Sequence, residues 1–463
     1  MSRLLGEKPV DRLARFLSTL QFENLPRDVV EKAKIHLADT LGAALAGTRS
    51  SEFHTASRIA DAPGGTPVWG TGRRIAARDA ALVNGVAAHA FELDDSGGCD
   101  HSGAVVVPAV FAALSETKRP VSGKSLITAI VAGYDAGRRI LEAAGGYDAH
   151  NSLGWHSTAT CGTFAAAAGA ARVFGLDPSA TRDAITLSTS FSSGLWAFIH
   201  DGSQAKKVHA GRAAEGGLLA AKLAAEGFTG PSQVFNDVWG GFFRSFNKAA
   251  CEPGKLSEAL GENFKVRRAV LKPYASCRGA HSSVDALNDM LAETGRKAGS
   301  IARIDLAVSA MLMGMCGAKE NGAMAPTQMS LPYALAARCV HGTAGLDAYA
   351  EERRHDPRIG DVMDRIRLSV DETMQPLDEP VVTIEFSDGL RLSRMVPRAT
   401  GSAERPMPID DVAAKFHALA SMSIDHAAAE KLWAAIGDLD ALEDASALLP
   451  LLAGHADERP LFR

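Results

Sequence analysis

The sequence lacks the patterns that define several classes of protein. Its six cysteines are spread out and none forms a C-x-x-C pair, so neither a zinc ribbon nor an iron–sulfur cluster is supported. The nucleotide loops G-x-x-x-x-G-K-[ST] and strand-linked G-x-G-x-x-G are missing, and so is the serine motif G-x-S-x-G. There is no dense run of Lys and Arg and the net charge is −5, so a nucleic-acid partner is not expected.

Targeting and membrane signals are also missing. The first residues include acids and lack the apolar core of a signal peptide. No apolar run reaches the ~18 residues that cross a bilayer. Free thiols in a large chain suit a reducing compartment. We therefore expect a cytoplasmic protein that has no membrane partner.

Aromatic residues make up only 6% of the 463 residues, whereas Ala and Gly are abundant. This composition favours closely packed helices, because small side chains let helix axes approach one another. From about residue 8 to residue 260 the apolar residues recur at helical spacing. The clearest predicted helices are Val29–Gly47, Ala77–His89, Ala104–Ser115, Ser125–Leu141, Thr158–Phe174 and Ala210–Glu226.

The pattern then changes to a mixture of strands and helices. Ile301–Ser309 alternates between apolar and polar residues, which predicts a strand, and Ile366–Val370 is a second short candidate. Val381–Phe386 and Leu390–Met395 flank an Asp-Gly pair, which predicts a β-hairpin. Helices are predicted at Ser282–Glu293 and Pro332–His341, and again after Gly401 at Ile409–Ser421 and His426–Asp438.

These patterns predict a mostly α fold with two domains. A large all-helical domain would be built from both chain ends, residues 1–265 and 400–463. An α+β lid domain, residues 266–399, would be inserted between them and pack on the helical domain.

The acidic stretch His89–Pro108 is the most informative part of the chain for function. Glu92, Asp94, Asp95 and Asp100 lie between apolar segments, so we expect them at the junction of two buried helices. Burial disfavours the ionised form, so we expect raised carboxyl pKa values that suit proton transfer. A structural alternative is that Asp95 and Ser96 only cap the following turn. Such side chains could also ligate a metal, but the spacings H-x-x-x-H and H-E-x-x-H are missing, so no metal is predicted.

Two further stretches place cationic side chains at predicted helix starts. His156 precedes Ser157 and Thr158, where free N–H groups and the helix dipole favour a bound carboxylate. Lys206 and Lys207 precede a helix of small residues, and only one of two adjacent lysines is expected to face a site. The structural alternatives are a packed histidine and a solvated pair of lysines.

A fourth stretch, Lys272–His281, lies where the helical pattern gives way to the mixed one. His281 at a helix start beside a domain boundary is a suitable cleft residue. Cys277 together with His281 would suit nucleophilic catalysis. Nothing else in the sequence supports acyl transfer, so a catalytic cysteine is not predicted.

Nine segments that include these stretches follow one another in a characteristic order. They are LADTLGAALAG (37–47), VNGVAAHAFELDDS (83–96), HSGAVVVPA (101–109), GYDAGRR (133–139), GWHSTAT (154–160), AAAAGAARVFGLD (165–177), QAKKVHAGRAAEGGLLAAKLAAEGFTGP (204–231), KPYASCRGAHSSVDAL (272–287) and SLPYALA (330–336). In this order the segments resemble the MmgE/PrpD family, which includes 2-methylcitrate dehydratase, cis-aconitate decarboxylase and iminodisuccinate epimerase.

The resemblance implies a homodimer with an active site in the cleft between its domains. It also implies a small polycarboxylate substrate, no metal and no organic cofactor. Together with the motifs above, it indicates which residues form the site. The expected catalytic residues are His101, Asp94, Asp95, Lys206 and His156. The expected substrate-binding residues are Glu92, Ser96, Lys207, His281 and Tyr333.

The chain departs from the family pattern around the acidic motif. Family members often have D-F-D-D-T where this chain has Glu92-Leu93-Asp94-Asp95-Ser96. Gly97-Gly98 stand in place of a histidine and a proline, and H-P-G or H-P-S becomes His101-Ser102-Gly103. These differences fall on the expected substrate pocket.

We expect a cofactor-independent lyase that abstracts a proton next to a carboxylate with loss of water, as in 2-methylcitrate dehydratase. The alternatives are an epimerase or isomerase of a dicarboxylic amino or imino acid, a cis-aconitate-type decarboxylase, and a non-catalytic anion-binding protein. In the catalytic cases Lys206, His156 and His281 would hold substrate carboxylates, because negative charge must be stabilised as the reaction proceeds. His101 and an acid, Asp94 or Asp95, would then move protons.

Overall fold

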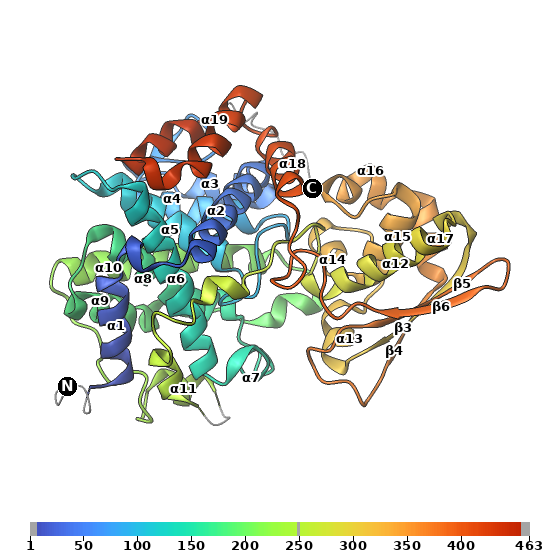
Figure 1. Ribbon diagram of the computed structural model, residues 1–463, viewed down its shortest axis with the longest axis horizontal. Helices are drawn as coiled ribbons and strands as arrows, with labels where there is room; N and C mark the ends of the chain where they lie inside the picture. The colour runs from blue at the N-terminus through green and yellow to red at the C-terminus, as the bar shows by residue number, and fades with distance from the viewer. Residues whose placement is uncertain (1–6, 248–250, 455–463) are drawn as a thin grey trace.

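Helices dominate the computed structural model, which describes residues 7–247 and 251–454 (Figure 1). The predicted mostly α fold class is confirmed. The larger, helical part contains α1 (Pro9–Thr19), α2 (Arg27–Gly47), α3 (Ser51–Ile59), α4 (Ala77–His89), α5 (Ser102–Glu116), α6 (Gly123–Ala143), α7 (Gly146–Asn151), α8 (Ser157–Phe174), α9 (Pro178–Leu187), α10 (Ala205–Ala225), α11 (Phe242–Phe246), α18 (Ile409–Ala420) and α19 (His426–Gly437). Among the described residues, no helix combines the length and the apolar character that a membrane crossing requires.

Glycines let the central helices α4, α8 and α10 approach closely. A Cβ atom on Gly217 of α10 would lie 2.5 Å from the Cβ of Ala166 in α8. A Cβ atom on Gly211 would lie 2.3 Å from the backbone oxygen of Leu82 in α4. Because neither position has room for a side chain, glycine fixes the start of α10 against both neighbours.

The smaller part is built on a four-stranded sheet in the order β4-β3-β5-β6. Its strands are β3 (Ile301–Val308), β4 (Ile366–Val370), β5 (Val381–Phe386) and β6 (Arg391–Met395). β3 pairs in parallel with β4 and antiparallel with β5, and β5 and β6 form the predicted hairpin. Gly389 in its turn has a φ of 86°, a conformation that favours glycine. The helices of this part are α12 (His281–Thr294), α13 (Ala310–Cys316), α14 (Met324–Gln328), α15 (Leu331–His341), α16 (Glu351–Arg354) and α17 (Pro357–Asp364).

The described residues bury two hydrophobic cores. The larger core contains residues between Val10 and Ala269 and again between Phe416 and Leu452. The smaller core is drawn mainly from residues between Ala275 and Val396. The chain thus returns to the helical part, where α18 and α19 contact α2 (Figure 1). We propose that the two cores correspond to the two expected domains, with boundaries near residues 265 and 400.

Two local features differ from the sequence-based expectations. Helix α10 begins at Ala205, five residues before the expected start at Ala210, because its first turn carries polar residues that apolar spacing cannot detect. A small two-stranded sheet of β1 (Pro63–Pro67) and β2 (Arg74–Ile75) lies in a segment where no strand was predicted. The sequence of β1, PGGTP, has none of the alternation that predicts a strand.

Candidate active site

A cavity of about 570 Å³ lies between the helical part and the α+β part. This volume suits a small organic acid. Its lining includes Glu92, Ser96, Asp100, His101 and Lys206 from the helical part, and Lys272, Cys277, Arg278, Leu312 and Glu379 from the α+β part. At its edge, the backbone of Ser96 pairs with that of Val270, which ties the acidic loop to the segment that leads into the α+β part.

Three helices begin beside this cavity. α5 starts directly after His101, α8 starts directly after His156, and α10 starts one residue before Lys206. Helix N-termini present free N–H groups and a partial positive charge. The fold therefore gathers three helix N-termini, each with a partial positive charge, on the helical side of the cavity.

Glu92, Lys206, Lys207 and Lys272 form a group that we call the lysine cluster. The Oε1 atom of Glu92 lies 2.7 Å from Nζ of Lys206 and 2.5 Å from Nζ of Lys207. Its Oε2 atom lies 3.3 Å from Nζ of Lys272, and all four side chains are buried. One carboxylate therefore faces three amino groups. Both adjacent lysines reach Glu92, but of the two only Lys206 lines the larger cavity, so the expectation that one of them faces the site stays a prediction.

The pKa values in the lysine cluster follow from burial and from these ion pairs. Burial opposes the charge on Glu92, but attraction by Lys206, Lys207 and Lys272 holds its pKa well below the usual range. Burial also opposes the charge on Lys206, yet Glu92 and other acids raise its pKa. The pKa of Lys207 is lowered, because burial and the repulsion of Lys206 outweigh the attraction of Glu92.

Lys207 faces a second, smaller cavity of about 230 Å³. Glu92, Lys206 and Met315 line both cavities, so the lysine cluster stands between them. The smaller cavity is also bordered by the segment from Phe198 to Ser203.

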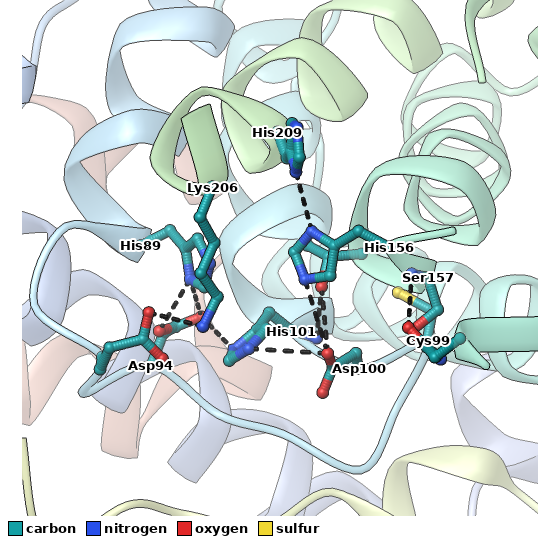
Figure 2. A network of polar contacts seen from close by, with 12 residues as sticks. His89, Asp94, Cys99, Asp100, His101, His156, Ser157, Lys206 and His209 are labelled. Carbon is teal, nitrogen blue, oxygen red and sulfur yellow. Dashed lines mark hydrogen bonds and ion pairs between the residues drawn. The ribbon is translucent and has the colours of Figure 1, made fainter. Parts of the chain in front are cut away.

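His89, Asp94, Asp100, His101 and His156 form a second group, the imidazole cluster. Asp94 Oδ2 lies 3.0 Å from Nδ1 of His89 and 2.9 Å from Nδ1 of His101. Because Nδ1 of His101 is engaged there, its other nitrogen, Nε2, faces Asp100 at 3.7 Å. Nε2 of His156 lies at the same distance, 3.7 Å, from the same oxygen of Asp100 (Figure 2).

Burial and neighbouring charges give the three imidazoles different pKa values. Burial opposes a charge on His101, but Asp94 and Asp100 outweigh it and raise the pKa of this ring. Burial lowers the pKa of His89 to about 3 and that of His156 to about 4. Of the three rings, His101 is therefore the one that binds an extra proton most readily.

The carboxyl groups do not have the raised pKa values expected from the sequence. Burial does oppose ionisation of Asp94 and Asp100, but His101 and the other nearby rings outweigh it and lower both pKa values. Glu92 behaves in the same way beside the lysines. The expectation is wrong for these three acids because it included burial but not ion partners from distant parts of the chain.

Two of the cavity acids have an unusual backbone conformation. Glu92 has a φ of 52° and Asp100 has a φ of 104°. Residues with a side chain rarely adopt positive φ, and such strain costs about 1–3 kcal/mol when it is imposed by the surrounding structure. Strained backbone is common at functional sites, so its occurrence at both acids agrees with a role for this loop.

Six of the ten expected site residues do not line the larger cavity: Asp94, Asp95, His156, Lys207, His281 and Tyr333. Asp95 accepts hydrogen bonds from the Gly103 backbone N–H at 2.8 Å and the Tyr134 hydroxyl at 2.6 Å, and so holds the start of α5. His281 is buried with Nε2 3.2 Å from the backbone oxygen of Ser276. The hydroxyl of Tyr333 donates to the backbone oxygen of Ala348 at 2.6 Å inside the smaller core. By contrast, Glu92, Ser96, His101 and Lys206 line the cavity, with Asp94 and His156 directly behind His101 and Asp100.

Several residues of the site were not among the site residues predicted from the sequence, although Cys277 was weighed there as a nucleophile. Asp100 directly precedes His101, and Lys272 opens the KPYASC segment, so both had a weak signal in their neighbours. His209 lies one helical turn after Lys206, and its Nδ1 is 2.9 Å from Nδ1 of His156. Cys277 lines the cavity, and a hydrogen bond with the Cys316 thiol together with nearby Lys206 outweighs burial and lowers its pKa to about 6.

Two sets of side chains in the described residues of this site are close enough to share a metal ion. One is His89, Asp94 and His101, and the other is Asp100, His101 and His156. In the first set the Nδ1 atoms of both rings already face Asp94. The second set has more room, because its nitrogens lie 3.7 Å from the Asp100 oxygen. A metal-free reaction therefore stays a prediction, to be tested with a chelator.

The chain matches the MmgE/PrpD N-terminal domain over residues 11–253 and the MmgE/PrpD C-terminal domain over residues 274–441. It is 29% identical to the cis-aconitate decarboxylase-like protein oryM of Aspergillus oryzae, over 96% of this chain and 97% of that protein. It is 30% identical to a cis-aconitate decarboxylase of Aspergillus terreus, over 95% of both chains. It is 26% identical to the human cis-aconitate decarboxylase, over 96% of this chain and 94% of the human one. The chain therefore belongs to the MmgE/PrpD family.

Proposed function

We propose that this protein is a cofactor-independent decarboxylase of a small unsaturated tricarboxylic acid such as cis-aconitate. Membership of the family supports a lyase-type enzyme, and the names of its relatives suggest the class of reaction. The observation that carries the proposal is the protonation pattern of the cavity. His101, a ring with a raised pKa, lines the cavity between Asp94 and Asp100, while cationic partners lower the pKa values of the nearby carboxylates Glu92 and Asp100.

The lysine cluster supports binding of a substrate with several carboxylates. Among the described residues, Glu92 is the one carboxylate that forms ion pairs with Lys206, Lys207 and Lys272, so anions from solution would complete the charge balance. Arg278 also lines the cavity, where it pairs with Glu379 at 2.5 Å. Hydrogen bonds between charged groups in a buried site are stronger than those between neutral groups, which favours a di- or tricarboxylate over a monocarboxylate.

The imidazole cluster supports protonation as the chemical step. In decarboxylation the bond to the carboxylate carbon breaks, carbon dioxide leaves, and the electron pair that remains takes up a proton. His101 can give this proton from Nε2, because its pKa is raised and Nδ1 is held by Asp94. Dehydration or epimerisation also needs a base, and the lowered pKa values of Glu92 and Asp100 make these carboxylates weak bases.

The test is to incubate the protein with cis-aconitate, citrate, 2-methylcitrate and an iminodicarboxylate in deuterated water. Proton NMR and carbon dioxide detection would follow each reaction. We expect carbon dioxide release from the unsaturated tricarboxylate, with one deuterium in the product, at a rate that dialysis against EDTA does not change. Loss of water without carbon dioxide, or binding without turnover of any acid, would contradict the proposal.

Cys277 favours a second candidate, in which the enzyme first abstracts a proton. This thiol lines the cavity, and the Cys316 thiol and nearby Lys206 lower its pKa, which favours the thiolate form. A thiolate is a suitable base for dehydration or epimerisation, which are the alternatives that the family offers. Cys277→Ala separates the two candidates, because a decarboxylase that uses only an acid would keep most of its kcat, whereas a dehydratase or epimerase would lose its base.

A further inference from the structure

His209 is a partly exposed residue that extends the imidazole cluster towards the protein surface. It lies on α10, and its Nδ1 is 2.9 Å from Nδ1 of His156 (Figure 2). The opposite nitrogen of His156 lies 3.7 Å from Asp100, and the same oxygen of Asp100 lies 3.7 Å from Nε2 of His101. Four side chains thus form one continuous row from the surface to the cavity.

We propose that this row, His209–His156–Asp100–His101, is a proton relay that reloads His101 from solvent after each turnover. The proposal rests on the proposed decarboxylation, which consumes one proton per turnover. A dehydratase would have no such need, because the proton that it abstracts leaves again with the hydroxyl group as water.

The contacts along the row allow protons to move inwards, provided that His209 is the donor to His156. Nδ1 of His209 and Nδ1 of His156 can form a hydrogen bond only if one carries a proton and the other does not. If His209 donates, His156 carries its proton on Nε2. This nitrogen is buried without a hydrogen-bond partner among the described residues, and it faces Asp100. In this arrangement each N–H points inwards, towards the cavity.

The proton balance of one cycle is complete. His101 gives the proton on Nε2 to the carbanion and becomes neutral. His209 takes a proton from solvent on Nε2 and passes the one on Nδ1 to His156. His156 passes its Nε2 proton through Asp100 to His101, so that one proton enters for each one consumed. Rotation of the rings then restores the starting tautomers.

The surroundings of the row exclude water from its middle section. The ring of His156 lies 5.0 Å from Trp196 and 5.7 Å from Phe198, and His209 lies 5.9 Å from Phe198, measured between ring centroids. His156 is fully buried, and burial keeps both His156 and His209 neutral at rest, with pKa values of about 4 and about 3. Neutral imidazoles can both accept and donate a proton, as a relay requires. The two 3.7 Å separations are longer than hydrogen bonds, and such contacts often shorten when substrate binds.

The experiment compares the first turnover with later turnovers. In His209→Gln the amide can still hydrogen-bond to His156, but it cannot carry a proton. With enzyme in excess, we expect the rate of the first turnover to stay within about twofold of wild type, because His101 is already protonated. With substrate in excess, the rate should fall about tenfold or more after a burst of one product per site.

Two further variants complete the design. His209→Ala leaves space for added imidazole, which should restore the steady-state rate without changing the first turnover. Val208→Ala, at the neighbouring exposed position on α10, should match wild type in both measurements. Equal losses in the first and later turnovers of His209→Gln would mean that His209 only positions His156, and no loss in either would mean that His101 is reloaded through the cavity. Both results overturn the relay, whereas failure of the wild-type protein to release carbon dioxide would overturn the proposed function instead.

Discussion

The lysine cluster and the imidazole cluster both border the cavity, but their charges are balanced differently. In the lysine cluster one carboxylate faces three amino groups. In the imidazole cluster two carboxylates, Asp94 and Asp100, face one ring with a raised pKa, and the pKa values of the other two rings are lowered. The lysine cluster has fewer acidic than basic side chains. In the imidazole cluster, one ring, His101, binds a proton more readily than the other two.

This difference follows from the chemistry of the two side chains. A lysine is a strong base, so Glu92 can keep several ammonium groups charged even in a buried place. An imidazole titrates near neutral pH, so modest effects decide its protonation. Burial is enough to lower the pKa values of His89 and His156, and two neighbouring carboxylates are enough to raise the pKa of His101. The comparison assigns substrate binding to the lysines and proton transfer to the imidazoles, and it can be tested one cluster at a time.

The largest expected effect comes from replacing His101, the ring that donates the proton in the proposed reaction. In His101→Gln the amide can keep the contact with Asp94 but cannot donate a proton to a carbanion. We expect kcat to fall by about 10²- to 10⁴-fold, with a much smaller change in KM. Steady-state kinetics on the best substrate would measure both. His417→Gln, outside the cavity, is the matched control, and a large rise in KM at constant kcat would instead make His101 a binding residue.

The next effect comes from removing the single anion of the lysine cluster. Glu92→Gln leaves three buried amino groups without their carboxylate, so we expect the free energy of unfolding to fall by about 3 kcal/mol. Citrate should recover more stability in this variant than in wild type, because its carboxylates can replace Glu92. Urea unfolding with and without citrate would measure both effects. Glu116→Gln, which breaks an exposed pair with Lys222, should change stability by less than about 1 kcal/mol. Equal stabilisation of Glu92→Gln and wild type by citrate would argue against anion binding at this cluster.

Most of the fold could be predicted from the sequence, because it depends on local spacing. The helix Ala77–His89 and the strands Ile366–Val370 and Val381–Phe386 have the predicted bounds. The start of α10 was missed because its first turn contains two lysines, which look solvent-exposed until Glu92 is placed beside them.

The candidate site was less predictable, because its properties depend on contacts between distant segments. Burial of the acidic loop could be inferred from its apolar flanks, but Lys206 and Lys272 come from positions more than a hundred residues away and reverse the predicted pKa shift of Glu92. The direction in which a side chain points is equally hard to predict from the sequence. Asp95 stands next to Asp94 in the sequence, yet its carboxylate turns into the helical part and contacts Tyr134.

The pH dependence of stability separates two histidines of the same cluster. The pKa of His89 is about 3 in the folded state, below the value of 6.5 expected when unfolded, so the unfolded state binds more protons in between. Between pH 7 and pH 5, this group should therefore lower the free energy of unfolding of wild type by about 2 kcal/mol. The free energy of unfolding of His89→Gln should fall by about 2 kcal/mol less than that of wild type over the same range. His101 has the opposite sign. Its raised pKa contributes stability that is complete below pH 6.5 and is lost as pH rises through the folded-state pKa. Urea unfolding from pH 5 to pH 8 would measure both, and identical pH slopes for wild type and His89→Gln would contradict a neutral buried ring.

The smallest effect concerns the strained backbone of Asp100. The carboxylate of this residue lies between the rings of His101 and His156. Both Asp100→Ala and Asp100→Gly remove the carboxylate, so they should lose activity equally. They differ in that glycine adopts a φ of 104° easily, whereas alanine does not. We expect the glycine variant to be more stable than the alanine variant by about 1 kcal/mol, which thermal unfolding of the two would measure. The opposite order of stability would mean that the backbone relaxes once the carboxylate is gone, so that the contacts of Asp100 with the two rings, rather than the surrounding loop, hold its unusual conformation.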